Sequence, residues 1–238
     1  MKIVRTVVRG IREWTSLLVV TLVLFVLLRL FVVEAFTIPT ASMERTLLVG
    51  DFLLVNKTLY GAEVPGTDVR IPAIREPRRG DVIVFRPPHD PHRDYVKRIV
   101  GMPGDTLSMR HKTLVVNGVP QDEPYARYLD GRSDAVHPKM RWQSDHLAAA
   151  GSAHGRYVPS RDNWGPIVVP PDRYFVLGDN RDNSEDSRYW GFVGREDIEG
   201  HPWLVYFSVR HPRDRRSGEG EGVLLERIRW SRIGQLIR

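Results

Sequence analysis

The feature that most constrains this chain is an almost unbroken apolar run near its N-terminus. From Trp14 to Val33 the sequence reads WTSLLVVTLVLFVLLRLFVV, and its only polar residues are Thr15, Ser16, Thr21 and Arg29. As a helix this stretch would measure about 30 Å, which matches the hydrocarbon core of a bilayer. We therefore predict one transmembrane helix over residues 14–33, because no other stretch of the sequence is comparably apolar.

The residues before the run predict its orientation. Residues 1–13 carry the basic residues Lys2, Arg5, Arg9 and Arg12 against a single acidic residue, Glu13. By the positive-inside rule, this segment is expected in the cytoplasm. Residues 34–238 are then expected to form a domain on the outer face of the membrane.

A cleaved secretory signal peptide is the alternative interpretation of the same run. Val33 and Ala35 would supply the small residues of a processing site. We favour an uncleaved anchor because the run is longer than the roughly 7 to 15 apolar residues usual in a signal peptide.

Beyond residue 34, the apolar residues come in short runs rich in β-branched and aromatic side chains and separated by Gly, Pro and Asp. These runs are DFLLVNK, DVIVFR, YVKRIVG, TLVVNG, PIVVP, RYFVLG and WLVYFSV. This pattern predicts a mainly β, barrel-like domain. Only residues 196–200 and the C-terminal 224–238 hint at helix, and the C-terminal segment could equally form a strand followed by a turn. Residues 127–156 are polar and aperiodic and predict a surface insertion, and residues 213–222 predict a flexible loop.

Composition excludes several classes of function. The chain has no cysteine, so a disulfide framework, a thiolate metal site and a cysteine nucleophile are excluded. The net charge of +6 arises from 35 basic and 29 acidic residues that are mixed along the chain. An anionic membrane surface fits this distribution as well as nucleic acid does, and we predict no nucleic-acid partner.

One lysine stands in an unusual setting. Only five of the 35 basic residues are lysines, and Lys97 lies in the β-rich segment DYVKRIVG. Strand alternation places its side chain on one face with Tyr95 and Ile99. A lysine with an ordinary pKa of about 10.4 is a poor base at neutral pH, but burial lowers that value. Arginine cannot play this role. Taken alone, Lys97 would be a solvated strand lysine, and Ser42 a turn or capping serine.

Two further segments carry polar side chains, and each has a metal-binding interpretation. In GDNRDNSEDSRYWGFV, residues 178–193, the residues Asp182, Ser184 and Asp186 have the spacing of a calcium loop. The Gly and Glu that such a loop needs at its sixth and twelfth positions are replaced by Ser187 and Val193. The segment around His89 and His92 is Pro-rich and predicts a surface turn. We expect no metal site.

Taken together, the motifs resemble the type I signal peptidases of bacteria, which are membrane-anchored proteases with a Ser/Lys dyad. The resemblance follows the family order through PTASMERTLLVGD, RRGDVIVFRPP, DYVKRIVGMPGD, WGPIVVPPDRYFVLGDNRDNSEDSRYWGFVG and RWSRIG. It implies Ser42 as the nucleophile and Lys97 as the general base. It also implies that Ser184 orients the amine, and that Thr40 and the Ser42 amide form the oxyanion hole.

The resemblance implies further roles. Asp186 and Arg188 would form a supporting ion pair, and Asp179 and Arg181 would steady the same loop. Shallow apolar substrate pockets would be lined by Phe36, Ile38, Met43, Leu47, Tyr95 and Val96. The implied substrates are exported preproteins cut after an A-x-A site, and no cofactor is implied. The bilayer of the plasma or inner membrane and the protein translocation machinery are the other expected partners.

The chain departs from the family's usual string around the nucleophile at three positions. Thr40 replaces Ser and keeps a hydroxyl donor. Ala41 replaces Gly, which puts a left-handed backbone there in doubt, and Arg45 replaces a turn-forming Pro. Two alternatives remain open: a self-cleaving Ser/Lys protease, which would need a DNA-binding domain where this chain has its apolar run, and a catalytically inactive, membrane-tethered β-domain that binds partner proteins.

Overall fold

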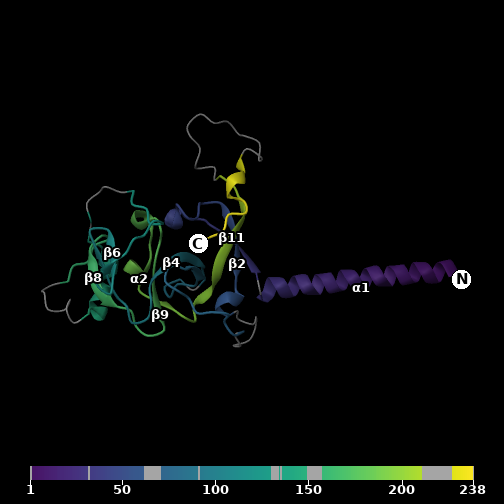
Figure 1. Ribbon diagram of the computed structural model, residues 1–238, viewed down its shortest axis with the longest axis horizontal. Helices are drawn as coiled ribbons and strands as arrows, with labels where there is room; N and C mark the ends of the chain where they lie inside the picture. The colour runs from purple at the N-terminus through teal and green to yellow at the C-terminus, as the bar shows by residue number, and fades with distance from the viewer. Residues whose placement is uncertain are drawn as a thin grey trace.

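The chain forms a long N-terminal helix and a separate β-rich body (Figure 1). The computed structural model describes residues 2–31, 33–61, 71–90, 92–129, 134, 136–148, 157–210 and 227–237. Helix α1 spans Lys2–Phe31 and extends away from the body. It begins well before the predicted residue 14, since residues 2–13 contain no proline and only one glycine, Gly10. Among the described residues, no helix is both long and apolar enough to qualify as a candidate membrane span.

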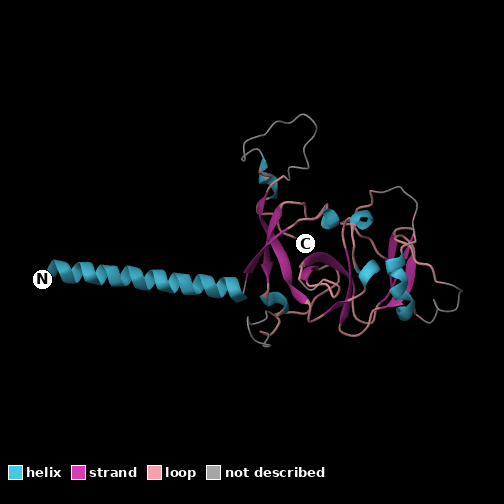
Figure 2. Cartoon of the chain, turned by 180° about the vertical axis from the view of Figure 1, so that it is seen from behind, coloured by secondary structure: helices cyan, strands magenta, loops and turns pink. Residues whose placement is uncertain are grey.

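The main sheet has seven strands in the order β1-β2-β11-β3-β4-β9-β10, and every pair in it is antiparallel. The strands are β1 (Val33–Thr37), β2 (Asp51–Asn56), β3 (Val82–Phe85), β4 (Tyr95–Gly101), β9 (Arg173–Leu177), β10 (Val193–Gly194) and β11 (Ile198–Ser208). The sheet curls into a half-barrel (Figure 2). Register shifts along β11, against both β2 and β3, provide the local bends that curling needs.

A smaller antiparallel sheet packs beside the first, with the order β7-β6-β5-β8. Its strands are β5 (Thr106–Arg110), β6 (Thr113–Val116), β7 (Val119–Pro120) and β8 (Trp164–Val168). Its apolar residues share one buried cluster with residues of β4 and β9, including Val100, Phe175 and Leu177. The short helices are η1 (Ala41–Met43), η2 (Thr58–Tyr60), η3 (Pro138–His146), η4 (Arg181–Asn183), α2 (Ser187–Trp190) and η7 (Trp230–Arg232). The prediction of a mainly β domain is confirmed.

One segment differs from the sequence-based expectations, a second follows the alternative of strand and turn, and a third is not described. Residues 198–200, expected in a helix, begin strand β11, because their alternating burial suits a strand. In the C-terminal segment, η7 is a single helical turn, Ile228 forms a bridge to Val209 directly after β11, and Leu236 forms a bridge to Leu204 in β11. Residues 213–222 lie outside the described residues.

Part of the predicted surface insertion 127–156 is ordered against the body. Within it, η3 packs on α2, and both Met140 and Gln143 are fully buried. Trp142 and Gln143 donate hydrogen bonds to the carbonyl oxygen of Arg188. These contacts could not be predicted from the polar composition of the segment, because they involve only a few residues on one side of a short helix.

Candidate active site

Ser42 lies in η1, in the loop that joins β1 to β2. The side chains of Met43 and Leu47 are buried in a cluster with Leu53, and the Leu47 amide donates to the Met43 carbonyl oxygen. These contacts fix the loop on the core and leave Ser42 only 9% exposed. We call residues 40–47 the nucleophile loop. It also contains Arg45, whose backbone has a positive φ of 100°.

Lys97 approaches Ser42 from β4. Its Nζ donates a hydrogen bond to Ser42 Oγ at 2.7 Å and a second to the Val96 carbonyl oxygen at 3.1 Å. The side chain is buried, and burial lowers the pKa of Lys97 to about 8. Among the described residues, no carboxylate forms an ion pair with Lys97. The amine is therefore held in contact with the hydroxyl by packing, and its neutral form is accessible near neutral pH.

Ser184 lies close to this pair without a hydrogen bond to either member. Its Oγ is buried and has no partner among the described residues. A Cβ added to Gly178 would lie 2.2 Å from Ser184 Oγ and 2.5 Å from the carbonyl oxygen of Ser42. The expected contact between Ser184 and the lysine amine is thus absent, although Gly178 lets the serine approach the nucleophile loop closely.

Asp186 and Arg188 form the ion pair that the sequence predicts. Arg188 Nε donates to Asp186 Oδ1 at 2.8 Å, its second donor reaches Oδ2 at 2.9 Å, and both residues are buried. Asp186 Oδ2 also accepts from the Gly178 amide at 3.0 Å. Burial raises the pKa of Asp186, but the Arg188 charge and these hydrogen bonds outweigh it, and the net shift is downward. The pair consequently fixes Gly178 beside the site.

Asp179 and Arg181 do not pair with each other, and sequence reasoning missed their partners. Asp179 accepts two hydrogen bonds from Arg98 at 2.7 and 2.8 Å. Arg181 donates two to Glu123 at 2.6 and 2.7 Å, and its Nε donates to the Gly178 carbonyl oxygen at 3.2 Å. Both residues hold the loop 178–184, but each holds it to a different part of the body.

Two further polar residues lie beside Ser42, one at its hydroxyl and one at its backbone carbonyl. Thr40 Oγ1 lies 3.4 Å from Ser42 Oγ. Ala41 has no positive φ, so the replacement of Gly there causes no backbone strain. Asn180, which sequence reasoning also missed, donates from its backbone to the Ser42 carbonyl oxygen at 3.0 Å and from its side chain to that of Ala41 at 3.1 Å. The only feature of the sequence that could have identified Asn180 is its position in the polar loop GDNRDN.

A pocket of about 360 Å³ is lined in part by Ser42 and Lys97. Of the six predicted lining residues, five line it: Phe36, Ile38, Met43, Tyr95 and Val96. Leu47 is instead fully buried in the core beneath the nucleophile loop. Ser42, Lys97 and Thr40 also line the pocket, and charged residues, including Arg93, Asp94 and Glu185, stand among its other lining residues. Apolar side chains therefore share the lining of the pocket with the serine, the lysine and several charged groups.

The carboxylates proposed for a calcium loop are already paired. Asp182 bonds to Lys112 and forms an ion pair with Arg161, while Asp186 pairs with Arg188. His89 stacks on Trp190, with ring centroids 5.3 Å apart. Among the described residues, no group of three or more acidic or histidine side chains has the arrangement of a metal site.

A β-rich body that buries a serine hydroxyl against a lysine amine in the lining of a partly apolar pocket has the arrangement of a serine endopeptidase. Comparison with known sequences identifies the family. The family model for signal peptidase, peptidase S26, matches residues 11–207, and the chain belongs to this family.

Named relatives agree with the family match. A signal peptidase I of Pseudomonas aeruginosa is 41% identical, covering 80% of this chain and 71% of that protein. One from Aquifex aeolicus is 34% identical, covering 82% of this chain and 83% of that protein. A solved signal peptidase I from Enterococcus faecalis is 31% identical and covers 54% of this chain and 98% of that chain, with a TM-score of 0.37. The family assignment rests on the sequence matches, and the resemblance seen in the sequence is confirmed.

Proposed function

We propose that this chain is a membrane-anchored endopeptidase that removes signal peptides from exported preproteins, with Ser42 as nucleophile and Lys97 as general base. The observation that carries the assignment of residues is the 2.7 Å contact between Lys97 Nζ and Ser42 Oγ, in the lining of the pocket. Membership of the signal peptidase family supports the proposed reaction. The contact between the amine and the hydroxyl supports the roles of Lys97 and Ser42 in it.

In the acylation step, neutral Lys97 accepts the proton of the Ser42 hydroxyl as Oγ attacks the carbonyl carbon of the scissile peptide bond. The oxyanion formed is held by the Ser42 amide and the Thr40 hydroxyl. The C–N bond then breaks, and the Lys97 ammonium returns its proton to the departing amine. In deacylation, Lys97 takes a proton from a water molecule that attacks the ester, and the proton is returned to Ser42 Oγ.

The pocket supports a preference for small residues before the cleavage site. Phe36, Ile38, Met43, Tyr95 and Val96 form the apolar part of its lining. Alanine side chains of an A-x-A site would fill the remaining depth, whereas larger side chains would collide with these residues. Leu47 acts from beneath as packing for the loop.

We propose that residues 14–33, which include the C-terminal part of α1 up to Phe31, anchor the enzyme in the plasma or inner membrane, with residues 1–13 in the cytoplasm and the β-rich body on the outer face. Along the described side chains of α1, apolar residues are exposed all around the helix, including Trp14 at 75%, Leu18 at 68% and Phe25 at 59%. Exposed apolar surface of this kind is stabilised by lipid. The bilayer and the translocation machinery are the proposed partners besides the preprotein.

The experiment compares the parent chain with Ser42→Ala and Lys97→Arg variants, purified in detergent, on a preprotein that carries an A-x-A signal. The N-terminus of the product is mapped by mass spectrometry. We expect only the parent to cut after the second alanine of the site. Equal cleavage by all three would overturn the assignment of the residues. No cleavage of several preproteins across pH 6 to 9 would favour the alternative, an inactive tethered domain that binds partner proteins.

A further inference from the structure

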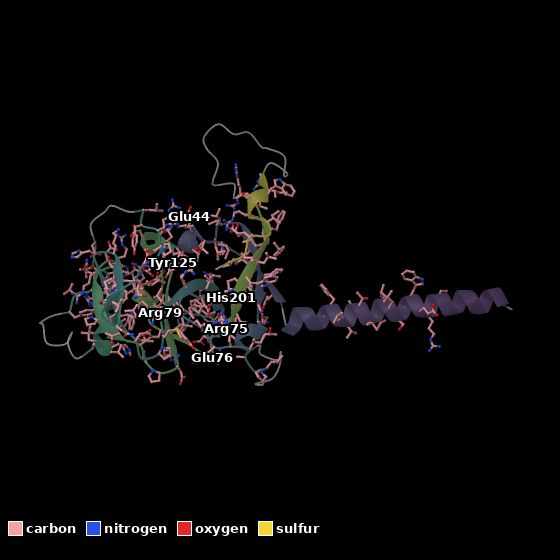
Figure 3. The ribbon with its side chains drawn as sticks, in the orientation of Figure 1. Glu44, Arg75, Glu76, Arg79, Tyr125 and His201 are labelled. Carbon is pink, nitrogen blue, oxygen red and sulfur yellow. The ribbon has the colours of Figure 1, made fainter. Side chains whose placement is uncertain are left out.

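A segment of the small sheet reaches across to the active site. Residues 121–129, which we call the strap, follow β7 and begin with a hydrogen bond from the Gln121 amide to the Leu114 carbonyl oxygen at 2.8 Å. The strap then crosses the body to the active-site side, where Figure 3 labels its Tyr125 near Glu44 of the nucleophile loop. None of its residues lines the pocket.

On one side, the strap pairs with the loop 178–184. The Arg127 amide donates to the Asp179 carbonyl oxygen at 2.6 Å, and the Arg181 amide donates to the Arg127 carbonyl oxygen at 2.9 Å. Arg98, which holds the Asp179 carboxylate, stacks on Tyr125 with its guanidinium 4.0 Å from the ring centroid. This side of the strap fixes both the backbone and the side chain of Asp179.

On the other side, the strap holds the nucleophile loop. Arg45 Nη1 donates to the Ala126 carbonyl oxygen at 3.2 Å, and Arg127 Nη1 lies 3.3 Å from Glu44 Oε1. The strap therefore bonds to both loops that meet at the active site. These two loops also meet directly, where the Asn180 amide donates to the Ser42 carbonyl oxygen.

Glu123 is a buried side-chain anchor of the strap. Its side chain is 7% exposed and meets Arg181, which is 1% exposed, in a two-pronged contact. Arg181 in turn donates a hydrogen bond to the Gly178 carbonyl oxygen. Gly178 lies against both Ser184 and the Ser42 carbonyl oxygen. Because a buried guanidinium without a counter-charge is strongly disfavoured, losing the Glu123 charge would displace Arg181 and release the loop.

We infer that the strap holds the two active-site loops in register and that Glu123, through Arg181, is a positioning residue for the reaction. The inference rests on the proposed function. It assigns the small sheet a part in catalysis, since β7 carries the strap to a site built otherwise from the main sheet and its loops.

The test uses the full chain in detergent with the variants Glu123→Gln, Glu123→Asp and the control Asp122→Asn. The control removes a carboxylate from the neighbouring, exposed residue. Two quantities are measured: kcat and KM for a preprotein, and the titration of Lys97 by NMR of 13C-labelled lysine. Only five lysines contribute signals, and the Lys97→Arg variant assigns the one of interest.

We expect Glu123→Gln to lower kcat at least tenfold with KM within about twofold, and to raise the pKa of Lys97 because a released loop admits water to the amine. Glu123→Asp, which keeps the charge, should recover part of kcat, and Asp122→Asn should match the parent. The inference is overturned if Glu123→Gln has the same kcat and the same Lys97 titration as the parent. It is also overturned if the whole decrease in kcat is explained by a smaller fraction of folded protein. The NMR titration needs no substrate. If the chain cut no preprotein, the proposed function would be refuted, and the titration would still show whether Glu123 positions the loops around Lys97.

Discussion

Lys97 Nζ lies 2.7 Å from Ser42 Oγ, although the two residues are 55 positions apart and belong to a strand and to a loop. The amine reaches the hydroxyl from an inner strand of the curled sheet, β4, which lies between β3 and β9. Its other hydrogen bond goes to the neutral carbonyl group of Val96. The protonation of Lys97 is therefore governed chiefly by burial, and the predictions on pH follow from this arrangement.

The first prediction concerns the pH dependence of cleavage. Because burial lowers the pKa of Lys97 to about 8, the amine is mostly protonated at pH 6 and mostly neutral at pH 9. Only the neutral amine accepts the serine proton, so kcat/KM should rise about tenfold per pH unit up to about pH 8 and then level off. The measurement is kcat/KM on a peptide without titratable groups, with Lys57→Gln as a control that keeps the same profile. A rate that is flat or falls between pH 6 and 8 would refute this role for Lys97.

The second prediction concerns the close approach at Gly178. In Gly178→Ala the new Cβ would lie 2.5 Å from the Ser42 carbonyl oxygen, which is backbone and cannot rotate away. The loops must separate by several tenths of an ångström, and we expect kcat to fall about 100-fold, since small displacements of reacting groups are costly. Gly10→Ala is the matched control, because that position has open space and an ordinary helical backbone. Near-parent activity of Gly178→Ala would show that the loops are not in close register.

The third prediction concerns Arg45, where the family commonly has proline. The φ of Arg45 is 100°, and proline is confined to about −65°. Arg45→Pro should therefore destabilise the fold by about 3 kcal/mol or more. Arg45→Gly should stay within about 1 kcal/mol of the parent, because relief of the backbone offsets the lost hydrogen bond to Ala126. Urea unfolding followed by tryptophan fluorescence measures both, and a stable Arg45→Pro variant would mean that the loop adopts a different turn.

The fourth prediction compares two ion pairs. Arg188→Met leaves the fully buried Asp186 carboxylate without its partner, and we expect a loss of about 3 to 5 kcal/mol in the free energy of unfolding. Arg173→Met breaks a surface pair with Glu196 in which both side chains are exposed, and should cost less than about 1 kcal/mol. Equal losses in the two variants, measured by urea unfolding at pH 8, would contradict a supporting role for the buried pair.

The sequence predicted the two residues at the centre of the site but only part of what holds them. Ser42 and Lys97 stand in local motifs, and strand alternation around Lys97 is readable from the apolar residues beside it. The short β-rich runs likewise predicted a mainly β body. These features depend on residues close together in the chain, which a linear pattern records.

The partners that hold the site could not be predicted, because each comes from a distant segment. Asp179 was grouped with Arg181, its neighbour in the loop, yet it bonds to Arg98 in β4, and Arg181 bonds to Glu123. Nothing near Glu123 in the sequence distinguishes it from a surface glutamate. Leu47 was assigned to the pocket by the family resemblance, but its side chain is fully buried beneath the turn that follows η1.

The last prediction concerns stability as a function of pH. The pKa of Lys97 is 10.5 when solvated and falls to about 8 in the fold. Between these two values the unfolded chain binds more protons than the folded chain, so the contribution of Lys97 to the free energy of unfolding increases with pH across this window. The full penalty, about 3 kcal/mol, is present below pH 8 and is lost by about pH 10.5. Lys97→Met, which removes the charge and keeps the length of the side chain, should therefore be more stable than the parent at pH 7, and the difference should shrink towards pH 10. Urea unfolding of both proteins at several pH values measures this difference directly, and the tyrosine titrations common to both cancel from it. A difference independent of pH would mean that Lys97 is solvated in the fold, and a difference of opposite sign would mean that a carboxylate stabilises its charged form.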